Sequence, residues 1–381
     1  MLRARSTLGR HLAWEIVTSV TLVLLAFLAL FAFFDFINEL DDIGRAGYSL
    51  AAAAIYVVLT LPSRTYEVMP VAALIGSVYA LAQLAAHSEF TAMRASGLGR
   101  ARALGELLRV GAWLALFTAL VGEALAPPAE RLAQEIRLTS LGSTVGGQLR
   151  SGLWIRDSVR APSGETLRIR FVNVGELMPD TTLRRVRVIE FDQQMRLTEV
   201  VTADRGDYTA PGQWKLAGVK ATRYNQASDE EALPLLRTER ASLDQLLWSS
   251  EITPALLSVL MVVPERMSAI SLFNYIRHLR ENQQNTELHE IAFWKKVVYP
   301  LAVMVMMALA LPFAYLQSRA GGIGYKVFAG IMLGVAFHFL NGLFSHLGLL
   351  NTWPPWLAVS IPSLVAFFVA VGLLRWVDRT R

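Results

Sequence analysis

Long uncharged stretches alternate with short charged ones in the first and last thirds of the chain. Because an α-helix rises about 1.5 Å per residue, roughly 20 apolar residues cross the hydrocarbon core of a bilayer. Stretches of this kind lie at 16–34, 46–88, 110–129, which is broken only by Glu123, and 297–318, and two more lie within 327–374. The last run is divided at 351–356, where two prolines and two tryptophans favour a turn at the membrane surface. The pattern therefore predicts an α-helical membrane bundle of six transmembrane helices.

The stretch 46–88 is long for one helix and is interrupted by Arg64 and Glu67. Cytoplasmic loops favour Lys and Arg, and a single crossing here places every basic segment on one side: 3–10, 94–109, 319–326 and 375–381. We therefore predict one long helix with kink points at Pro62 and Pro70. Both termini are then cytoplasmic, and the polar middle of the chain lies outside.

The polar middle, 141–263, has the pattern of strands. Leu167, Ile169 and Phe171 alternate with arginines, which is the period of a half-buried strand, and turn signals such as Pro211-Gly212 recur at short intervals. This predicts an all-β domain, an antiparallel sandwich or roll. The expected organisation is helices one to three in 1–140, strands in 141–263, and in 264–381 an amphipathic connecting helix over 264–296 followed by helices four to six.

Composition supports a membrane protein and narrows its chemistry. Hydrophobic residues make up 54% of the chain and charged residues only 18%, outside the range of ordinary soluble domains. The absence of cysteine excludes disulfides, thiolate metal sites and a cysteine nucleophile. No GxxxxGK(S/T) loop is present, so any use of ATP requires a partner. His289-Glu290 begins a zinc-binding HExxH pattern, but Phe293 replaces the second histidine. We expect no catalytic residue, metal, cofactor or nucleic-acid partner.

The short segment between the second and third spans, 88–97, is the strongest candidate in the chain for a contact with another protein. Ser88 is expected to cap a short helix, Glu89 lies in its first turn, Phe90 and Met93 form an apolar side, and Gly97 ends it. Such a helix suits a groove on another protein. An interfacial loop without function explains the same residues equally well.

Several segments, taken in order, resemble one family. They are Pro70-Val71-Ala72-Ala73-Leu74-Ile75-Gly76 in the second span, Ser88-Glu89-Phe90 and Met93-Arg94-Ala95-Ser96-Gly97 after it, Gly122-Glu123 and Ala126-Pro127 at the end of the third span, and Gly152-Leu153-Trp154-Ile155-Arg156-Asp157 among the strands. Together they resemble the lipopolysaccharide export permeases, LptF/LptG, and the LptG pattern more than the LptF pattern.

The resemblance implies a non-catalytic permease of the bacterial inner membrane with a periplasmic β-jellyroll. It also implies an LptF-like permease as partner, two LptB-like ATPase subunits, an LptC-like membrane protein, and lipopolysaccharide as cargo passed to a periplasmic bridge. The segment after the second span would couple to the ATPase through Ser88, Glu89, Phe90, Met93 and Arg94.

The resemblance also implies contacts with the cargo. Arg137 matches a residue that contacts the lipid A phosphates, whereas Asp35, Asp41 and Asp42 stand where the family can carry lysines. Because these positions carry aspartates, Arg131 or the partner subunit is expected to supply the remaining contacts with the phosphates. A lipid also needs an apolar cavity, and two helical stripes are candidates: Leu24, Phe27, Phe31 and Phe34 in the first span, and Phe328, Met332, Val335 and Phe339 in the fifth. Ordinary packing or lipid contact explains such stripes as well.

Other readings of the sequence remain open. His338 and His346 in the fifth span suit a proton relay or simple hydrogen bonding, and Gly330 and Gly334 suit close helix packing. A membrane-anchored sensor or scaffold would also combine spans with an outer strand domain. It would not need a docking helix between spans, and copurification of an ATPase would separate the two classes. An intramembrane enzyme would need converging catalytic groups inside the spans.

Overall fold

The computed structural model describes residues 2–45, 47–141, 152–160, 166–178, 182–226, 236–259, 263–315, 322–351 and 353–379. Within these ranges six helices are long and apolar enough to cross a membrane, which confirms the predicted number: Thr7–Leu40, Leu50–Ala86, Arg100–Ser140, Glu287–Tyr315, Ile323–Leu350 and Pro355–Trp376. The stretch 46–88 forms the single long helix α2 (Leu50–Ala86), with Pro62 and Pro70 inside it.

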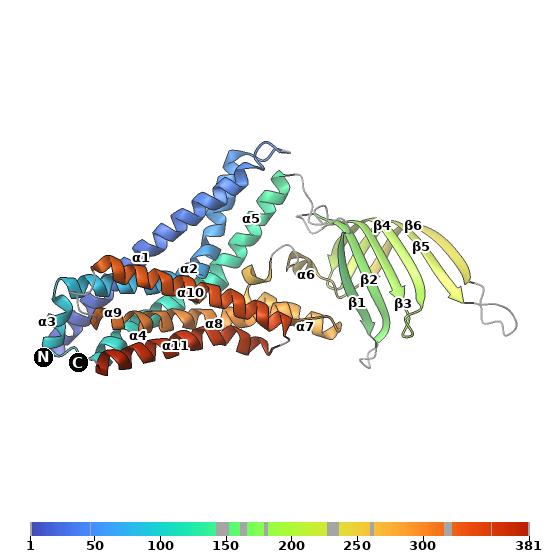
Figure 1. The fold of residues 1–381 in the computed structure, drawn as a ribbon. Helices are drawn as coiled ribbons and strands as arrows, with labels where there is room; N and C mark the ends of the chain where they lie inside the picture. Colours follow the sequence, from blue (N-terminus) through green and yellow to red (C-terminus); the bar gives the residue numbers. More distant parts are fainter. Residues whose placement is uncertain are drawn as a thin grey trace.

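The bundle has two distinct ends. In Figure 1 both chain termini lie at one end, together with the short helix α3 (Glu89–Ala95), whereas all the strands lie beyond the other end. We call these the terminal end and the strand end. The arrangement follows from chain order, because α1 (Leu2–Leu40), α2 and the third span precede the strands and three spans follow them.

Two spans consist of more than one helical segment. The third joins α4 (Arg100–Leu120), a π-helical turn η1 (Val121–Leu125) and α5 (Ala126–Ser140). The fourth joins α8 (Glu287–Ala310) to α9 (Pro312–Tyr315). The fifth and sixth are α10 (Ile323–Leu350) and α11 (Pro355–Arg379). The helices are longer than the apolar runs that predict them, because their polar ends continue beyond the hydrophobic stretch.

Helix α2 is the centre of the bundle and packs against α1, α5, α8 and α10. Small residues allow close approach of the neighbouring helices. A Cβ on Gly76 of α2 would lie 2.5 Å from the Cα of Val20 in α1, and a Cβ on Gly334 of α10 would lie 2.8 Å from a methyl carbon of Val71 in α2. The Gly330 and Gly334 pair therefore serves close helix packing, as expected from the sequence.

The strand domain is one six-stranded antiparallel sheet in the simple order β1-β2-β3-β4-β5-β6. Its strands are β1 (Leu153–Arg160), β2 (Thr166–Leu177), β3 (Leu183–Phe191), β4 (Leu197–Ala210), β5 (Gln213–Gln226) and β6 (Leu236–Ser249). The all-β prediction is confirmed. The described strands differ from the expected jellyroll, since they form a curved meander (Figure 1) and not two sheets joined by Greek-key crossovers.

The predicted period of β2 is present, but the predicted buried face is wrong. Val172 and Val174 are buried, whereas Leu167 is 46% exposed. Strand pairing explains the reversal, because β2 places Val172 opposite Val188 and Val174 opposite Val186, and both partners are core residues of β3. The arginines on this face of β2, Arg168 and Arg170, form ion pairs with Glu190 of β3.

Short helices connect the sheet to the fourth span. They are α6 (Pro254–Val259), the 3-10 turn η2 (Pro264–Arg266) and α7 (Ala269–Glu281). The amphipathic helix expected over 264–296 is therefore α7 and the first turns of α8 rather than one continuous element. The amphipathic pattern is present in α7, where Leu272, Ile276 and Leu279 are all buried.

Candidate functional site

Helix α3 follows α2 after a sharp turn at the terminal end. Ser88 precedes α3 with a left-handed backbone (φ 62°) and makes no capping hydrogen bond through its side chain, so its predicted capping role is wrong. A capping serine normally has an extended backbone, from which its hydroxyl reaches the first amides. The predicted stop at Gly97 is confirmed: Gly97 has φ +97°, its N–H donates to the carbonyl of Arg94, and the N–H of Leu98 donates to that of Met93.

The apolar side of α3 is buried within this chain. Phe90 and Met93 are 1% and 4% exposed, and the Phe90 ring meets Tyr315 of α9 edge to face with centroids 5.2 Å apart. The guanidinium of Arg94 lies 5.4 Å from the centre of the Tyr315 ring. The expectation that Phe90 and Met93 form an open docking side is therefore wrong. The exposed side of α3 carries Glu89 instead.

Glu89 joins α3 to the first span. Its carboxylate oxygen lies 3.2 Å from Nε2 of His11 in α1, and both side chains are about half exposed (49% and 46%). Exposed pairs of this kind stabilise little. Glu89 thus remains available to a binding partner, while the apolar residues behind it fix the helix to the bundle.

At the strand end, Arg137 is held by acidic residues. Its Nε donates to Glu39 at 3.1 Å and its terminal nitrogen to Asp42 at 2.6 Å. Tyr48 donates to the same Glu39 carboxylate at 2.8 Å, and burial together with that carboxylate raises the pKa of Tyr48, so the phenol stays protonated. Arg131 is exposed and has no ion pair within the described parts of the chain. Of the two predicted phosphate contacts, only Arg131 is open to a ligand without rearrangement.

The two predicted apolar stripes differ in exposure. On α10, Phe328, Met332, Val335 and Phe339 are all exposed, by 52% to 67%. On α1, Phe34 is 52% exposed, and Leu24, Phe27 and Phe31 are half-buried. Both helices pack on α2. The stripes therefore lie on helices attached to one central element; the described part of this chain leaves the α10 stripe uncovered and covers the α1 stripe in part.

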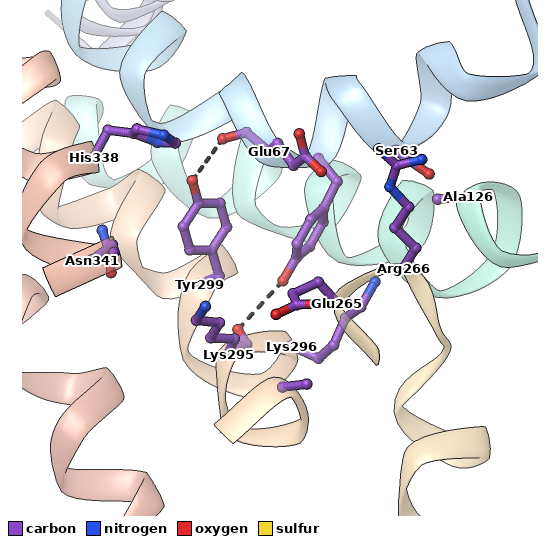
Figure 2. A pocket seen from close by; sticks show the side chains of 13 residues that line it. Ser63, Glu67, Ala126, Glu265, Arg266, Lys295, Lys296, Tyr299, His338 and Asn341 are labelled. Carbon is purple, nitrogen blue, oxygen red and sulfur yellow. Dashed lines mark hydrogen bonds between the residues drawn. The ribbon is translucent and has the colours of Figure 1, made fainter. Parts of the chain in front are cut away.

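A pocket of about 260 Å³ lies among α2, α8, α10 and η2 (Figure 2). Its lining contains two tyrosines that fasten α2 to α8: Tyr299 donates to the carbonyl of Glu67 at 2.6 Å, and Tyr66 donates to the carbonyl of Lys295 at 3.4 Å. His338 also lines the pocket, whereas His346 is exposed elsewhere on α10. Sequence reasoning missed this site, although charged residues bordering the apolar runs were a visible signal.

A polar connection runs from the third span to the strand domain. Glu123 in the π-helical turn accepts hydrogen bonds from the backbone N–H groups of Ala269 at 2.7 Å and Ile270 at 3.3 Å, at the start of α7. Asn282, which follows α7, accepts a bond from Ser158 of β1 at 2.7 Å. Helix α7 is thus fixed to a membrane span at one end and to the sheet at the other.

These features define a class: a multi-pass membrane protein whose described residues form six spans, with a short helix between the second and third spans and a strand domain between the third and fourth. The family model described as "Lipopolysaccharide export system permease LptF/LptG" matches residues 10–376. The chain belongs to this family. The match gives no support to the alternative of a sensor or scaffold.

Two named relatives align with this chain over nearly its full length. The chain is 27% identical to the lipopolysaccharide export system permease protein LptG of Escherichia coli strain K12 over 370 residues, which cover 96% of this chain and 97% of the relative. Identity to LptG of Haemophilus influenzae is also 27% over 370 residues, with 97% and 98% covered. Both relatives are named as permeases of one export system, and the LptG type predicted from sequence is the type found.

Proposed function

We propose that this chain is the LptG-type permease subunit of an exporter that extracts lipopolysaccharide from the bacterial inner membrane and passes it to a periplasmic bridge. The observation that carries the proposal is the family match over residues 10–376, on a chain with the six spans and strand domain described above. A separate ATPase supplies the energy, since the sequence contains no P-loop.

The proposed orientation places the terminal end in the cytoplasm and the strand domain in the periplasm. The described residues of the predicted basic segments lie at the terminal end, and the positive-inside rule assigns that end to the cytoplasm. Both chain termini and α3 then share one compartment with the ATPase.

In this proposal α3 receives the movement of an LptB-like ATPase, two copies of which serve this chain and an LptF-like partner. Glu89 is placed at the contact because it is exposed, whereas Phe90 and Met93 carry the movement into the bundle through Tyr315. The guanidinium of Arg94 lies over the same ring. The five predicted coupling residues thus divide into a contacting part, Ser88 and Glu89, and an anchoring part.

The cargo's acyl chains are proposed to lie against the stripes of α1 and α10, with matching helices of the LptF-like subunit closing the cavity. An LptC-like membrane protein joins this assembly. Arg131 contacts the lipid phosphates, and Arg137 does so only after leaving Glu39 and Asp42. Inward movement of α1 and α10 would expel the lipid, and α7 would pass the same movement to the sheet through Glu123 and Asn282.

Purification from detergent followed by reconstitution tests the proposal. We expect an ATPase and lipopolysaccharide to copurify with the chain, and ATP to drive lipid release from vesicles to a soluble acceptor. Glu89→Gln should reduce release per ATP hydrolysed, whereas Glu135→Gln, an exposed glutamate on α5 at the opposite end, should not. The function is wrong if no ATPase copurifies and if release is independent of ATP.

A further inference from the structure

The pocket of Figure 2 contains more positive than negative charge. Three cations line it, Arg266 from η2 and Lys295 and Lys296 from α8, against two carboxylates, Glu67 and Glu265. The set shares no residue with the predicted phosphate contacts Arg131 and Arg137. The pocket is therefore a separate basic site at the strand end.

Arg266 and Lys296 are held by direct hydrogen bonds, whereas Lys295 interacts with Glu265 only beyond ion-pair distance. Arg266 donates to Glu130 at 2.6 Å, and the Lys296 ammonium donates to the carbonyl of Gly122 at 3.1 Å. Glu67 accepts from Arg64 at 3.1 Å, which offsets its charge. Lys295 has no ion pair within 4.0 Å in the described ranges of the chain, and in Figure 2 its ammonium points toward the side where Asn341 of α10 lies. A half-buried lysine in this position favours an anionic ligand.

The depth of the pocket indicates which anions can reach it. Lys295 lies two residues before the uncharged run that begins at Val297, and Glu67 lies directly before the run that begins at Val68. Lys295 therefore lies at the boundary between the fourth apolar span and the strand end, and the pocket places the charged interruption of α2 at Glu67 beside it. Lipid phosphates occupy this boundary layer in a bilayer. The neighbouring α10 presents exposed apolar residues beside the pocket, such as Leu343, which suit the acyl chains of the same molecule.

We propose that this pocket binds the phosphate of an anionic membrane lipid, with Lys295 as the principal contact and Arg266 and Lys296 framing it. Binding requires only that the spans lie in a membrane, so the inference does not depend on export activity. The occupant would fill the space between α2, α8 and α10 and so stabilise one separation of these helices.

Because the chain contains no cysteine, a single introduced thiol can report on occupancy. Gly342 lines the pocket, and a Cβ placed there meets no atom within 4 Å, so Gly342→Cys fits without distortion. The full-length chain, in the complex with which it purifies, is placed in nanodiscs of phosphatidylcholine alone, with phosphatidylglycerol, or with lipopolysaccharide. A fourth sample contains phosphatidylcholine nanodiscs and inorganic phosphate. The rate of thiol labelling is measured in each.

We expect an anionic lipid to slow labelling, and Lys295→Gln to require roughly tenfold more of that lipid for the same protection, since a charge-assisted hydrogen bond is lost. Lys295→Arg should retain protection, and Lys220→Gln, which removes a charge from the exposed surface of β5, should change nothing. Unchanged labelling, or equal protection in Lys295→Gln, would overturn the proposal. Equal protection by inorganic phosphate would overturn its lipid part. Protection by phosphatidylglycerol in a complex that releases no lipopolysaccharide would support this inference while the proposed function failed.

Discussion

Replacing Phe90 by alanine tests whether α3 acts through its buried side. The ring is 1% exposed and packs edge to face on Tyr315. Truncating a buried phenylalanine costs about 3–5 kcal/mol. Helix α3 has only seven residues and is too short to persist without packing. A loss of 3 kcal/mol lowers the population of docked α3 relative to undocked by a factor of more than about 100.

The assay compares ATP hydrolysis with lipid release in the reconstituted complex. We expect Phe90→Ala to retain the ATPase in the complex but to lower lipid release per ATP, because a weakened attachment of α3 to the bundle transmits less of the ATPase movement. Phe90→Leu keeps most of the buried apolar surface and should restore much of the coupling. Thr91→Ala changes an exposed neighbour on the same helix and serves as the control.

Two results would refute this reasoning. If Phe90→Ala kept full coupling, the contact with Tyr315 would not transmit movement. If Phe90→Ala abolished assembly with the ATPase while the chain stayed folded, the ring would contact the partner directly, as the sequence pattern first indicated. Thermal unfolding of the variant in detergent separates either result from general misfolding.

Three further predictions concern the strand domain, its connection and the bundle. Glu190 accepts from Arg168 and Arg170 at 2.6 Å each; burial alone would raise the pKa of Glu190, but these partners outweigh it and the pKa is lowered. The interaction of ionised Glu190 with the two arginines therefore stabilises the fold above the ordinary carboxylate pKa of 4.5, and this stabilisation is lost as pH falls through the lower pKa of the folded state. Glu190→Gln should cost roughly 1–3 kcal/mol at neutral pH. It should also reduce the loss of thermal stability at acid pH in a series of unfolding curves. Glu123→Ala should destabilise the start of α7 by about 1 kcal/mol, seen as faster hydrogen exchange at Ala269 and Ile270, whereas unchanged exchange would exclude a capping role. Gly76→Ala should destabilise the bundle by about 1–3 kcal/mol, because the added Cβ meets the backbone of Val20, while Gly105→Ala, which meets nothing within 4 Å, should be nearly neutral or stabilising in the same unfolding assay.

The spans could be predicted from sequence because a membrane helix depends on a local property, the length of an apolar run. The end of α3 at Gly97 could also be predicted, because a helix stop depends on a local property, a glycine that adopts the left-handed conformation. The buried face of β2 depends on pairing with β3, and the alternation of Leu167, Ile169 and Phe171 alone could not identify it. The burial of Phe90 depends on Tyr315, which is far away in sequence. The pocket escaped prediction because Glu67, Arg266 and Lys295 come from three separate segments.

Helix α2 connects the proposed ATPase contact with the proposed cargo surfaces. Only His87 and Ser88 separate the end of α2 from the start of α3, so displacement of α3 acts directly on α2. Along α2, Gly76 contacts α1 closely and Val71 contacts Gly334 of α10. Because these contacts leave no space for an added methyl group, α1 and α10 must follow α2 or separate from it. A force on α3 would therefore reach both apolar stripes through one rigid element, which makes α2, rather than either stripe, the part of the chain where a single methyl group should interfere most with coupling.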